Sequence, residues 1–344
     1  MIVIKKITWA SVLAIIFISA CIEPNTEELW ELEAIKTFET SGFCRSVDIH
    51  NDIAYLSAGQ AGGQIWDLNS NQKIVELDQY SPSQDLSDIS QVVFSPTVNK
   101  LFVLENNSRV VIMDLINGDS LVVLGEEMSE KTREIQILEK DSSSYIILAA
   151  DNDDGLKWNQ FDHDTTWNIW SNVAGDEYST PGKPTGIAYL DGKIVMSVDQ
   201  QGVELWNLDS LGSDPVFVNR LDTPGNAEKV TLTASGVFVA CDDAGARYIP
   251  LEAFDQSSSR TDIEAPWTPR QFAQDLTVDH IANKGNIAIL SIGSKGIAIY
   301  DISDPRSPES RGIFDIGYTY SATFWGEKLV VCTREGLKIF NINQ

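Results

Sequence analysis

The sequence predicts an all-β fold, a seven-bladed β-propeller of four-stranded antiparallel blades. Three observations indicate it: strand-like apolar runs fill the chain, one strand–turn–strand unit recurs seven times, and the spacing is nearly constant. Each copy ends its second strand in a large apolar residue, the anchor residue of the unit. The anchor residues are Trp66, Met113, Trp158, Trp206, Ile249, Tyr300 and Phe340, spaced 40 to 51 residues apart. Repeats of this length with four short strands are typical of propeller blades.

The clearest copy of the unit is the stretch 285–308, GNIAILSIGSKGIAIYDISDPRSP. Its two Ile-rich runs alternate with small or polar residues, as expected of strands packed between neighbouring sheets. Five of the seven copies carry a glycine four residues before the anchor residue. These glycines are Gly62, Gly202, Gly245, Gly296 and Gly336. A tight turn that requires positive φ explains a glycine there, so the two strands are expected to form a hairpin.

Each blade needs an inner strand before the hairpin and an outer strand after it. The inner strands are expected at 45–49, 90–94, 134–138 and 185–190, and the outer strands at 73–77, 120–124 and 215–221. The last copy stops at Gln344 without an outer strand, whereas a spare strand, LEAIKTFE, occupies residues 32–39. We expect this N-terminal strand to complete the last blade and close the ring, which would hide two sheet edges.

The N-terminal residues have the layout of a secretory signal. Lys5 and Lys6 form a charged region, residues 7–18 form an apolar core that is short for a spanning helix, and small residues lead to Cys21. The sequence therefore divides into a signal peptide at 1–20, an acidic tether and a folded part.

The segment ISAC, which ends at Cys21, resembles the lipobox of bacterial lipoproteins. The resemblance implies cleavage before Cys21 and acylation of this residue, and several acyl chains would anchor the protein stably to a membrane. Ile22 stands where an aspartate would imply retention at an inner membrane, so the resemblance favours an outer-membrane lipoprotein of the bacterial cell envelope, on its periplasmic or surface face. The alternative is an ordinary signal peptide or an uncleaved anchor with a chance cysteine. The tether then spans 21–31 and the propeller 32–344.

Residues 296–314, GIAIYDISDPRSPESRGIF, resemble the LVIVD-repeat family of bacterial extracytoplasmic β-propellers. The first, fourth and seventh units follow the family pattern only loosely, and the others depart from it. The resemblance implies surface binding or scaffolding and no shared catalytic residues. WD40 repeats are the nearest rival, because residues 65–68, IWDL, contain the WD dipeptide, but the accompanying Gly-His is absent.

Composition excludes nucleic acid as a partner. The chain has 50 acidic and 25 basic residues, a formal charge of −25, and removal of residues 1–20 with their two lysines makes it −27. Such a surface repels phosphate backbones. After lipidation of Cys21, the remaining cysteines are Cys44, Cys241 and Cys332, which allow one disulfide at most and leave its pairing open; burial as small residues is the alternative.

The candidate binding residues lie mainly in the hairpin turns, which in propellers surround the central channel on one face. This placement rests on analogy between folds. The polar turn residues proposed for binding are Asp199, Asp242, Asp243, Lys295 and Arg334, joined by Arg45 at the start of an inner strand. The segments 79–90, 171–184 and 255–275 read as long loops. In the last of them, Trp267, Arg270 and Phe272 form a trio suited to stack a sugar or a peptide, and partial burial over a blade is the alternative.

A calcium site is the one cofactor hypothesis. Asp151, Asp153 and Asp154 alternate with polar residues before Gly155, a pattern of oxygen ligands that suits Ca²⁺, although the spacing excludes an EF-hand. A solvated polar turn is the alternative.

The function favoured by the sequence is non-catalytic: an envelope-anchored propeller that binds or scaffolds a protein, peptide or glycan partner. The chain has three histidines and lacks HxH, HExxH and GxSxG motifs, which disfavours zinc and serine-hydrolase chemistry. The alternative is a propeller hydrolase or lyase that uses carboxylates of the turn face, with or without Ca²⁺, on an extracytoplasmic substrate.

Overall fold

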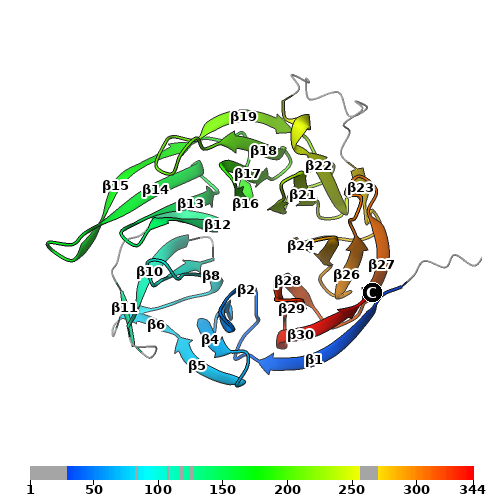
Figure 1. Ribbon diagram of the computed structural model, residues 1–344, viewed down its shortest axis with the longest axis horizontal. Helices are drawn as coiled ribbons and strands as arrows, with labels where there is room; N and C mark the ends of the chain where they lie inside the picture. The colour runs from blue at the N-terminus through cyan, green and yellow to red at the C-terminus, as the bar shows by residue number, and fades with distance from the viewer. Residues whose placement is uncertain (1–28, 82–83, 107, 117–119, 124–127, 256–269) are drawn as a thin grey trace, which may run out of the picture.

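The computed structural model, shown in Figure 1, describes residues 29–81, 84–106, 108–116, 120–123, 128–255 and 270–344. Within these residues the regular secondary structure is β-strand, apart from a single 3-10 turn, η1 (Leu251–Ala253). No helix in this part of the chain has the length and apolar character needed to cross a membrane. The predicted all-β class is confirmed.

Five sheets have four antiparallel strands each, which follow one another along the sheet from the innermost strand outward. The first is β2 (Ser46–His50), β3 (Ile53–Ser57), β4 (Gly63–Asp67) and β5 (Gln72–Leu77). The next are β16 (Pro184–Leu190), β17 (Lys193–Val198), β18 (Gly202–Asn207) and β19 (Val216–Leu221), then β20 (Lys229–Leu232), β21 (Gly236–Ala240), β22 (Ala246–Pro250) and β23 (Arg270–Phe272). The last two are β24 (His280–Lys284), β25 (Ile287–Ser291), β26 (Ile297–Asp301) and β27 (Glu309–Phe314), then β28 (Thr319–Trp325), β29 (Lys328–Thr333), β30 (Gly336–Asn343) and β1 (Glu31–Glu39).

A sixth, eight-stranded sheet replaces two of the predicted blades. It contains β8 (Ile89–Ser95), β9 (Lys100–Glu105), β10 (Ser108–Ile116), β11 (Ser120–Val123), β12 (Met128–Asp141), β13 (Ser144–Asp151), β14 (Gly155–Asp164) and β15 (Ile169–Tyr178). The prediction of seven separate four-stranded sheets is therefore wrong, because β12 starts early and its first residues pair with β10, at Ser108↔Thr132 and Val110↔Met128. β6 (Gln79–Ser81) and β7 (Gln84–Asp85) form a separate two-stranded sheet, and β6 contacts β11.

The sheets follow one another in chain order around a central space (Figure 1). The innermost strands are β2, β8, β12, β16, β20, β24 and β28, each of which contacts the next, while β28 also contacts β2. Hydrophobic clusters fill the space between neighbouring sheets; one of them packs Phe238, Tyr248 and Phe272 against Leu290 and Tyr300. Six of the seven anchor residues are buried, and the seventh, Trp66, packs partly buried against such a cluster.

The predicted pairing of the N-terminal strand with the last strand is confirmed. β1 runs antiparallel to β30, with Leu32 opposite Ile342 and Phe38 opposite Leu337. A Cβ added at Gly336 would lie 2.1 Å from the carbonyl oxygen of Phe38 in β1. A Cβ added at Gly296 would lie at the same distance from the carbonyl oxygen of Phe314, in the outermost strand of its own sheet. Because Gly296 and Gly336 meet equivalent carbonyls, β1 occupies the position of an outermost strand.

The folded part begins before the predicted boundary. Trp30 is 7% exposed and packs in the cluster between the sheets β24–β27 and β28–β1, while its backbone N–H donates to the carbonyl of Arg311 at 3.0 Å. Trp30 and Glu31 therefore belong to the fold, although the sequence analysis placed them in the tether.

Two of the three predicted long loops are largely strands. Residues 169–178 form β15, the outermost strand of its half of the eight-stranded sheet, and residues 79–85 include the hairpin β6–β7. β15 is mostly exposed, and its apolar residues do not alternate with polar ones, so the sequence did not reveal a strand there. Most of the third segment, residues 256–269 with Trp267, lies outside the described residues.

Candidate functional site

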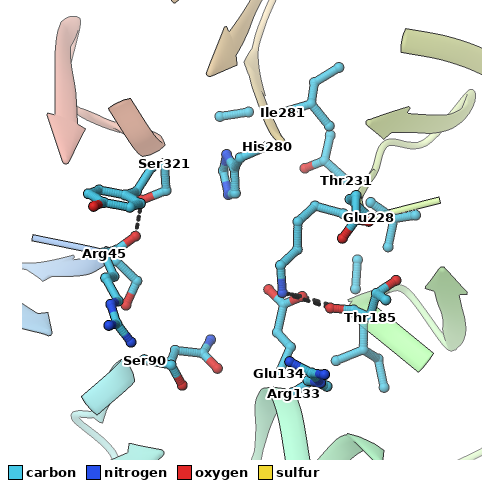
Figure 2. Close-up of a pocket in the computed structure, with 18 of the residues that line it drawn as sticks. Arg45, Ser90, Arg133, Glu134, Thr185, Glu228, Thr231, His280, Ile281 and Ser321 are labelled. Carbon is cyan, nitrogen blue, oxygen red and sulfur yellow. Dashed lines mark hydrogen bonds and ion pairs between the residues drawn. The ribbon is translucent and has the colours of Figure 1, made fainter. Parts of the chain in front are cut away.

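The central space is a cavity of about 1130 Å³, lined by residues of all seven innermost strands (Figure 2). At one end, hairpin turns contact the beginnings of these strands through the backbone bridges Gly59↔Ile89, Asp242↔Val278 and Gly293↔Thr319. We call this end the loop rim: the residues that lead into the innermost strands, together with the hairpin turns that contact them. Of the predicted turn residues, Asp242 forms one of these bridges and Asp199 lines the cavity.

One side of the loop rim is acidic. The acidic sector consists of Asp199, Glu228, Asp242, Asp243 and Asp279, contributed by the sheets that begin at β16, β20 and β24. Burial raises the pKa of Glu228, and the neighbouring carboxylates of Asp242 and Asp199 raise it further. Burial and the carboxylates of Asp242 and Asp243 likewise raise the pKa of Asp279. The carboxylates of the acidic sector therefore repel one another, and a cationic group of a ligand would reduce this repulsion.

The sequence analysis named three members of the acidic sector and missed two. Glu228 and Asp279 each precede an innermost strand, β20 and β24, and their backbone N–H groups donate to the strand alongside, as that of Arg45 does before β2. The repeat itself carried the signal, because Arg45 stands at the equivalent position of the first unit.

The adjoining part of the rim, on the last and first sheets, carries aromatic rings and an arginine; Gly293 lies between Asp279 and Tyr318, where this part meets the acidic sector. We call Phe43, Tyr318, Tyr320 and Arg334 the aromatic–arginine cluster. The rings of Phe43 and Tyr320 stack with centroids 6.2 Å apart, and those of Tyr318 and Tyr320 lie 5.0 Å apart. The guanidinium of Arg334 lies 4.1 Å from the Tyr318 centroid and 5.5 Å from that of Phe43. Cation–π contact thus holds an exposed apolar surface in place.

Phe43 is the most informative member of the cluster. Its side chain is 48% exposed although it lines the cavity with Tyr320. Single apolar residues scattered over a surface are common, whereas an exposed aromatic ring that packs with other rings beside a cavity indicates a binding surface. The sequence analysis named Arg334 but neither Phe43 nor the two tyrosines. These three residues lie before or within the innermost strands β2 and β28, whereas the search covered mainly the hairpin turns.

Arg45 lies on the cavity wall and is already paired. Its guanidinium forms an ion pair with Asp88 at 2.7 Å, and its carbonyl accepts a hydrogen bond from Ser321 Oγ at 2.8 Å. Figure 2 shows the Arg45 side chain extending along the cavity toward Ser90 of β8. The pairing with a neighbouring acid lowers its availability to a ligand but fixes a positive charge at the rim.

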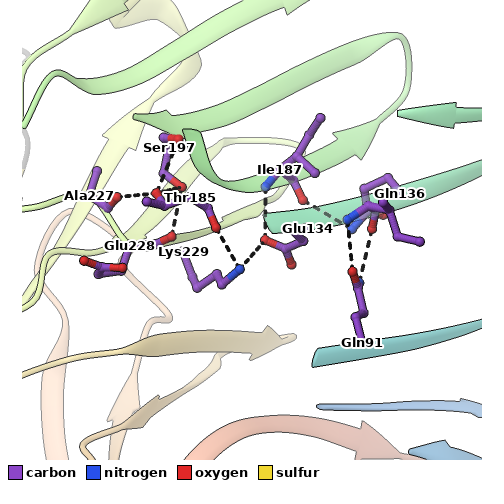
Figure 3. A network of polar contacts seen from close by, with 10 residues as sticks. Gln91, Glu134, Gln136, Thr185, Ile187, Ser197, Ala227, Glu228 and Lys229 are labelled. Carbon is purple, nitrogen blue, oxygen red and sulfur yellow. Dashed lines mark hydrogen bonds and ion pairs between the residues drawn. The ribbon is translucent and has the colours of Figure 1, made fainter. Parts of the chain in front are cut away.

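Deeper in the cavity a polar network joins three sheets (Figure 3). Lys229 Nζ donates to Glu134 Oε2 at 2.9 Å and to the carbonyl of Thr185 at 2.8 Å, and Glu134 Oε2 also accepts the Ile187 backbone N–H at 3.1 Å. Gln91 adds a two-way bond with the backbone of Ile135, at 2.9 and 3.2 Å. These groups are engaged with one another, so the cavity wall is a fixed scaffold below the rim.

His280 faces the cavity from the start of β24 (Figure 2). Burial, with the nearby positive charge of Lys229, lowers the pKa of His280 to about 3. Its Nδ1 is buried without a hydrogen-bond partner. The imidazole of His280 is therefore neutral at physiological pH. Within the described residues, no group of three or more His, Cys, Asp or Glu side chains is arranged to hold a metal ion.

The proposed calcium ligands serve other contacts. Asp151 is buried and accepts the backbone N–H groups of Asp153 and Asp154 at 3.0 and 3.1 Å, which closes the turn between β13 and β14. Asp153 pairs with Lys131 at 2.6 Å and Asp154 with Lys157 at 3.4 Å. This arrangement gives the calcium hypothesis no ligand cage, and the hypothesis stays a prediction.

The remaining predicted residues do not join the cavity. Lys295 is exposed at the hairpin turn between β25 and β26, and Arg270 is exposed on β23, an outermost strand. Trp267 and Cys21 lie outside the described residues. The lipid anchor and the stacking role of Trp267 therefore stay predictions.

Comparison with known proteins shows the fold alone. No protein-family model and no curated protein matches the chain. Among solved structures, the computationally designed Ika8 protein is similar, with a TM-score of 0.59 and 12% sequence identity over 90% of this chain and 100% of that chain. The chain thus belongs to the class of all-β proteins built from several four-stranded antiparallel sheets.

Proposed function

We propose that the protein is a seven-bladed β-propeller lipoprotein of the bacterial cell envelope, and that it binds a peptide or glycan partner at the loop rim without catalysis. The number seven takes the eight-stranded sheet as two blades, β8–β11 and β12–β15, joined by the short β10–β12 pairing. The pairing of β1 with β30 and the contacts among the seven innermost strands support this assignment. The LVIVD-repeat resemblance of residues 296–314 agrees with it.

The observation that carries the binding proposal is the aromatic–arginine cluster beside the cavity. Stacked rings held by Arg334 lose little conformational entropy when they bind, and flat exposed rings suit the apolar faces of sugars and of peptide side chains. The acidic sector that adjoins the cluster favours a partner that also carries positive charge. Charge and aromatic contact together favour a ligand that carries a cationic group next to a flat apolar face.

Removal of the cluster is expected to weaken binding about tenfold or more, because buried aromatic and arginine anchors dominate most interfaces. The measurement is binding of the purified protein to an array of defined bacterial glycans and basic peptides, followed by affinities of the best probe for Phe43→Ala and Arg334→Ala. Trp167→Ala is the matched control, since Trp167 is 74% exposed between β14 and β15, away from the cavity.

Equal losses in all three variants, or none in the two cluster variants, would overturn the rim as the binding site. Added salt is expected to weaken a basic probe further through screening of the acidic sector. Turnover of a bound glycan that is lost in Glu228→Gln would instead favour the alternative hydrolase, with a carboxyl of raised pKa as the acid.

The anchoring part of the proposal has an independent test. Cys21→Ser is expected to move the protein from the membrane fraction to the soluble fraction, because stable anchoring needs acyl chains that only the cysteine can carry. The measurement is fractionation of cells that express the full chain, with Cys241→Ser as the control. Wild-type protein found free in the soluble fraction would refute the anchor.

A further inference from the structure

Two buried cysteines meet where the first and last sheets pack together. Cys44 leads into β2 and Cys332 lies in β29, 288 residues later, yet their Sγ atoms are 2.9 Å apart. Both residues are fully buried in a hydrophobic cluster with Leu56, Val330 and Leu337. The Cys44 backbone N–H also donates to the carbonyl of Thr333 at 3.2 Å, so the backbone holds the two residues side by side.

We propose that Cys44 and Cys332 form a disulfide that joins the first and last sheets covalently. In the first step, a thiolate of one cysteine attacks a disulfide oxidant, which forms a mixed disulfide and releases one thiol of the oxidant. The thiolate of the second cysteine then attacks the protein sulfur, which forms the Cys44–Cys332 bond and releases the second thiol. Two protein thiols are oxidised, one oxidant disulfide is reduced, and the two protons end on the released thiols.

Burial determines when this reaction takes place. The thiolate is the reactive form, and burial beside Cys332 raises the pKa of the Cys44 thiol well above its ordinary value. The folded pair therefore reacts slowly with an oxidant, and the bond forms while the first and last sheets are docking. An extracytoplasmic compartment, as proposed for this protein, supplies disulfide oxidants at that stage.

The position of the bond gives it a specific role. β1 and β30 join the two ends of the chain by hydrogen bonds and side-chain packing without a covalent link, and the innermost strands β28 and β2 contact each other. A cross-link between Cys44 and Cys332 closes a loop of almost the entire fold, and longer loops lose more entropy in the unfolded chain. The bond thus stabilises the junction that the two ends of the chain form.

The test is independent of location and of ligand binding. The full chain is reduced, denatured and refolded with oxidised glutathione, after which free thiols are alkylated in denaturant and peptides are mapped without reduction. The expected result is a linked pair of Cys44 and Cys332 peptides and an alkylated Cys241. Cys241 is the matched control, because it is equally buried and its Sγ lies 3.7 Å from the carbonyl of Val239.

A second measurement separates the bond from simple packing. The oxidised protein is expected to melt about 5 °C above the reduced protein, and this gap should vanish in the double variant Cys44→Ala, Cys332→Ala but persist in Cys241→Ala. Alkylation of both Cys44 and Cys332 after refolding with oxidant would overturn the proposal. Peptide mapping of the wild type decides the matter even where the double variant fails to fold.

Discussion

Phe38→Ala is expected to destabilise the protein by about 3–5 kcal/mol, the usual loss when a fully buried phenylalanine is truncated. Phe38 is 2% exposed and is the one fully buried side chain of β1. Its ring meets Trp66 edge-on at 5.4 Å between centroids and packs in the cluster that also holds Leu337. The loss therefore falls on the contact between β1, the last sheet and the first sheet.

The cavity left by Phe38→Ala is expected to loosen β1 and to expose the edge of β30, which invites pairing between chains. The measurements are chemical unfolding and light scattering at moderate temperature. Ile35→Ala is the matched control, because Ile35 is an apolar residue of the same strand that is 44% exposed, and a change of about 0.5 kcal/mol is expected there. Similar losses for both variants would show that β1 does not hold the fold together through Phe38.

The architecture followed from the sequence where the repeat was strong. Gly296 and Gly336 have φ of 90° and 130°, as the predicted turns require, and β1 pairs where a missing outer strand was expected. Asp301 shows why an acid follows an anchor residue: its Oδ1 accepts the backbone N–H and the hydroxyl of Ser303, which closes the turn after the strand. Turn contacts of this kind involve residues close together in the sequence and recur along the chain, so the sequence predicts them.

The joined sheet and the strand β15 could not be predicted in the same way. The pairing of β10 with β12 depends on how far β12 extends toward its N-terminus, and the polar run from Met128 to Arg133 gave no strand pattern. β15 is largely exposed on both faces, so it lacks the apolar alternation by which a strand is recognised. Both elements are fixed by pairing with a neighbour and not by their own sequence.

The candidate site shows the same division. The turn acids Asp199, Asp242 and Asp243 were predictable because hairpin turns share one face of the repeat. The aromatic–arginine cluster was not, because Phe43 lies almost 300 residues from Arg334 and the two meet only through the contact of the first and last sheets. Long-range contacts that depend on the meeting of the two ends leave no periodic signal in the sequence.

His280→Gln is expected to make the protein more resistant to acid. The pKa of His280 is about 3 in the folded protein, lowered by burial and by Lys229, whereas a histidine in the unfolded chain titrates near 6.5. Between these values the unfolded chain binds a proton that the folded protein does not, so His280 lowers stability as the pH falls below about 6.5. Glutamine cannot take up that proton, and the variant escapes this loss.

The expected size is about 2–3 kcal/mol of stability that the wild type loses relative to His280→Gln between pH 7.5 and 4.5. Denaturant unfolding at each pH measures it, and the difference between the two proteins cancels the opposite effect of Glu228 and Asp279, whose raised pKa values favour the folded state in acid. NMR titration of the folded wild type should leave the His280 ring neutral down to about pH 4. Parallel stability curves would mean that His280 has the same pKa in the folded protein as in the unfolded chain. Burial and the charge of Lys229 would then not disfavour the protonated imidazole in the cavity.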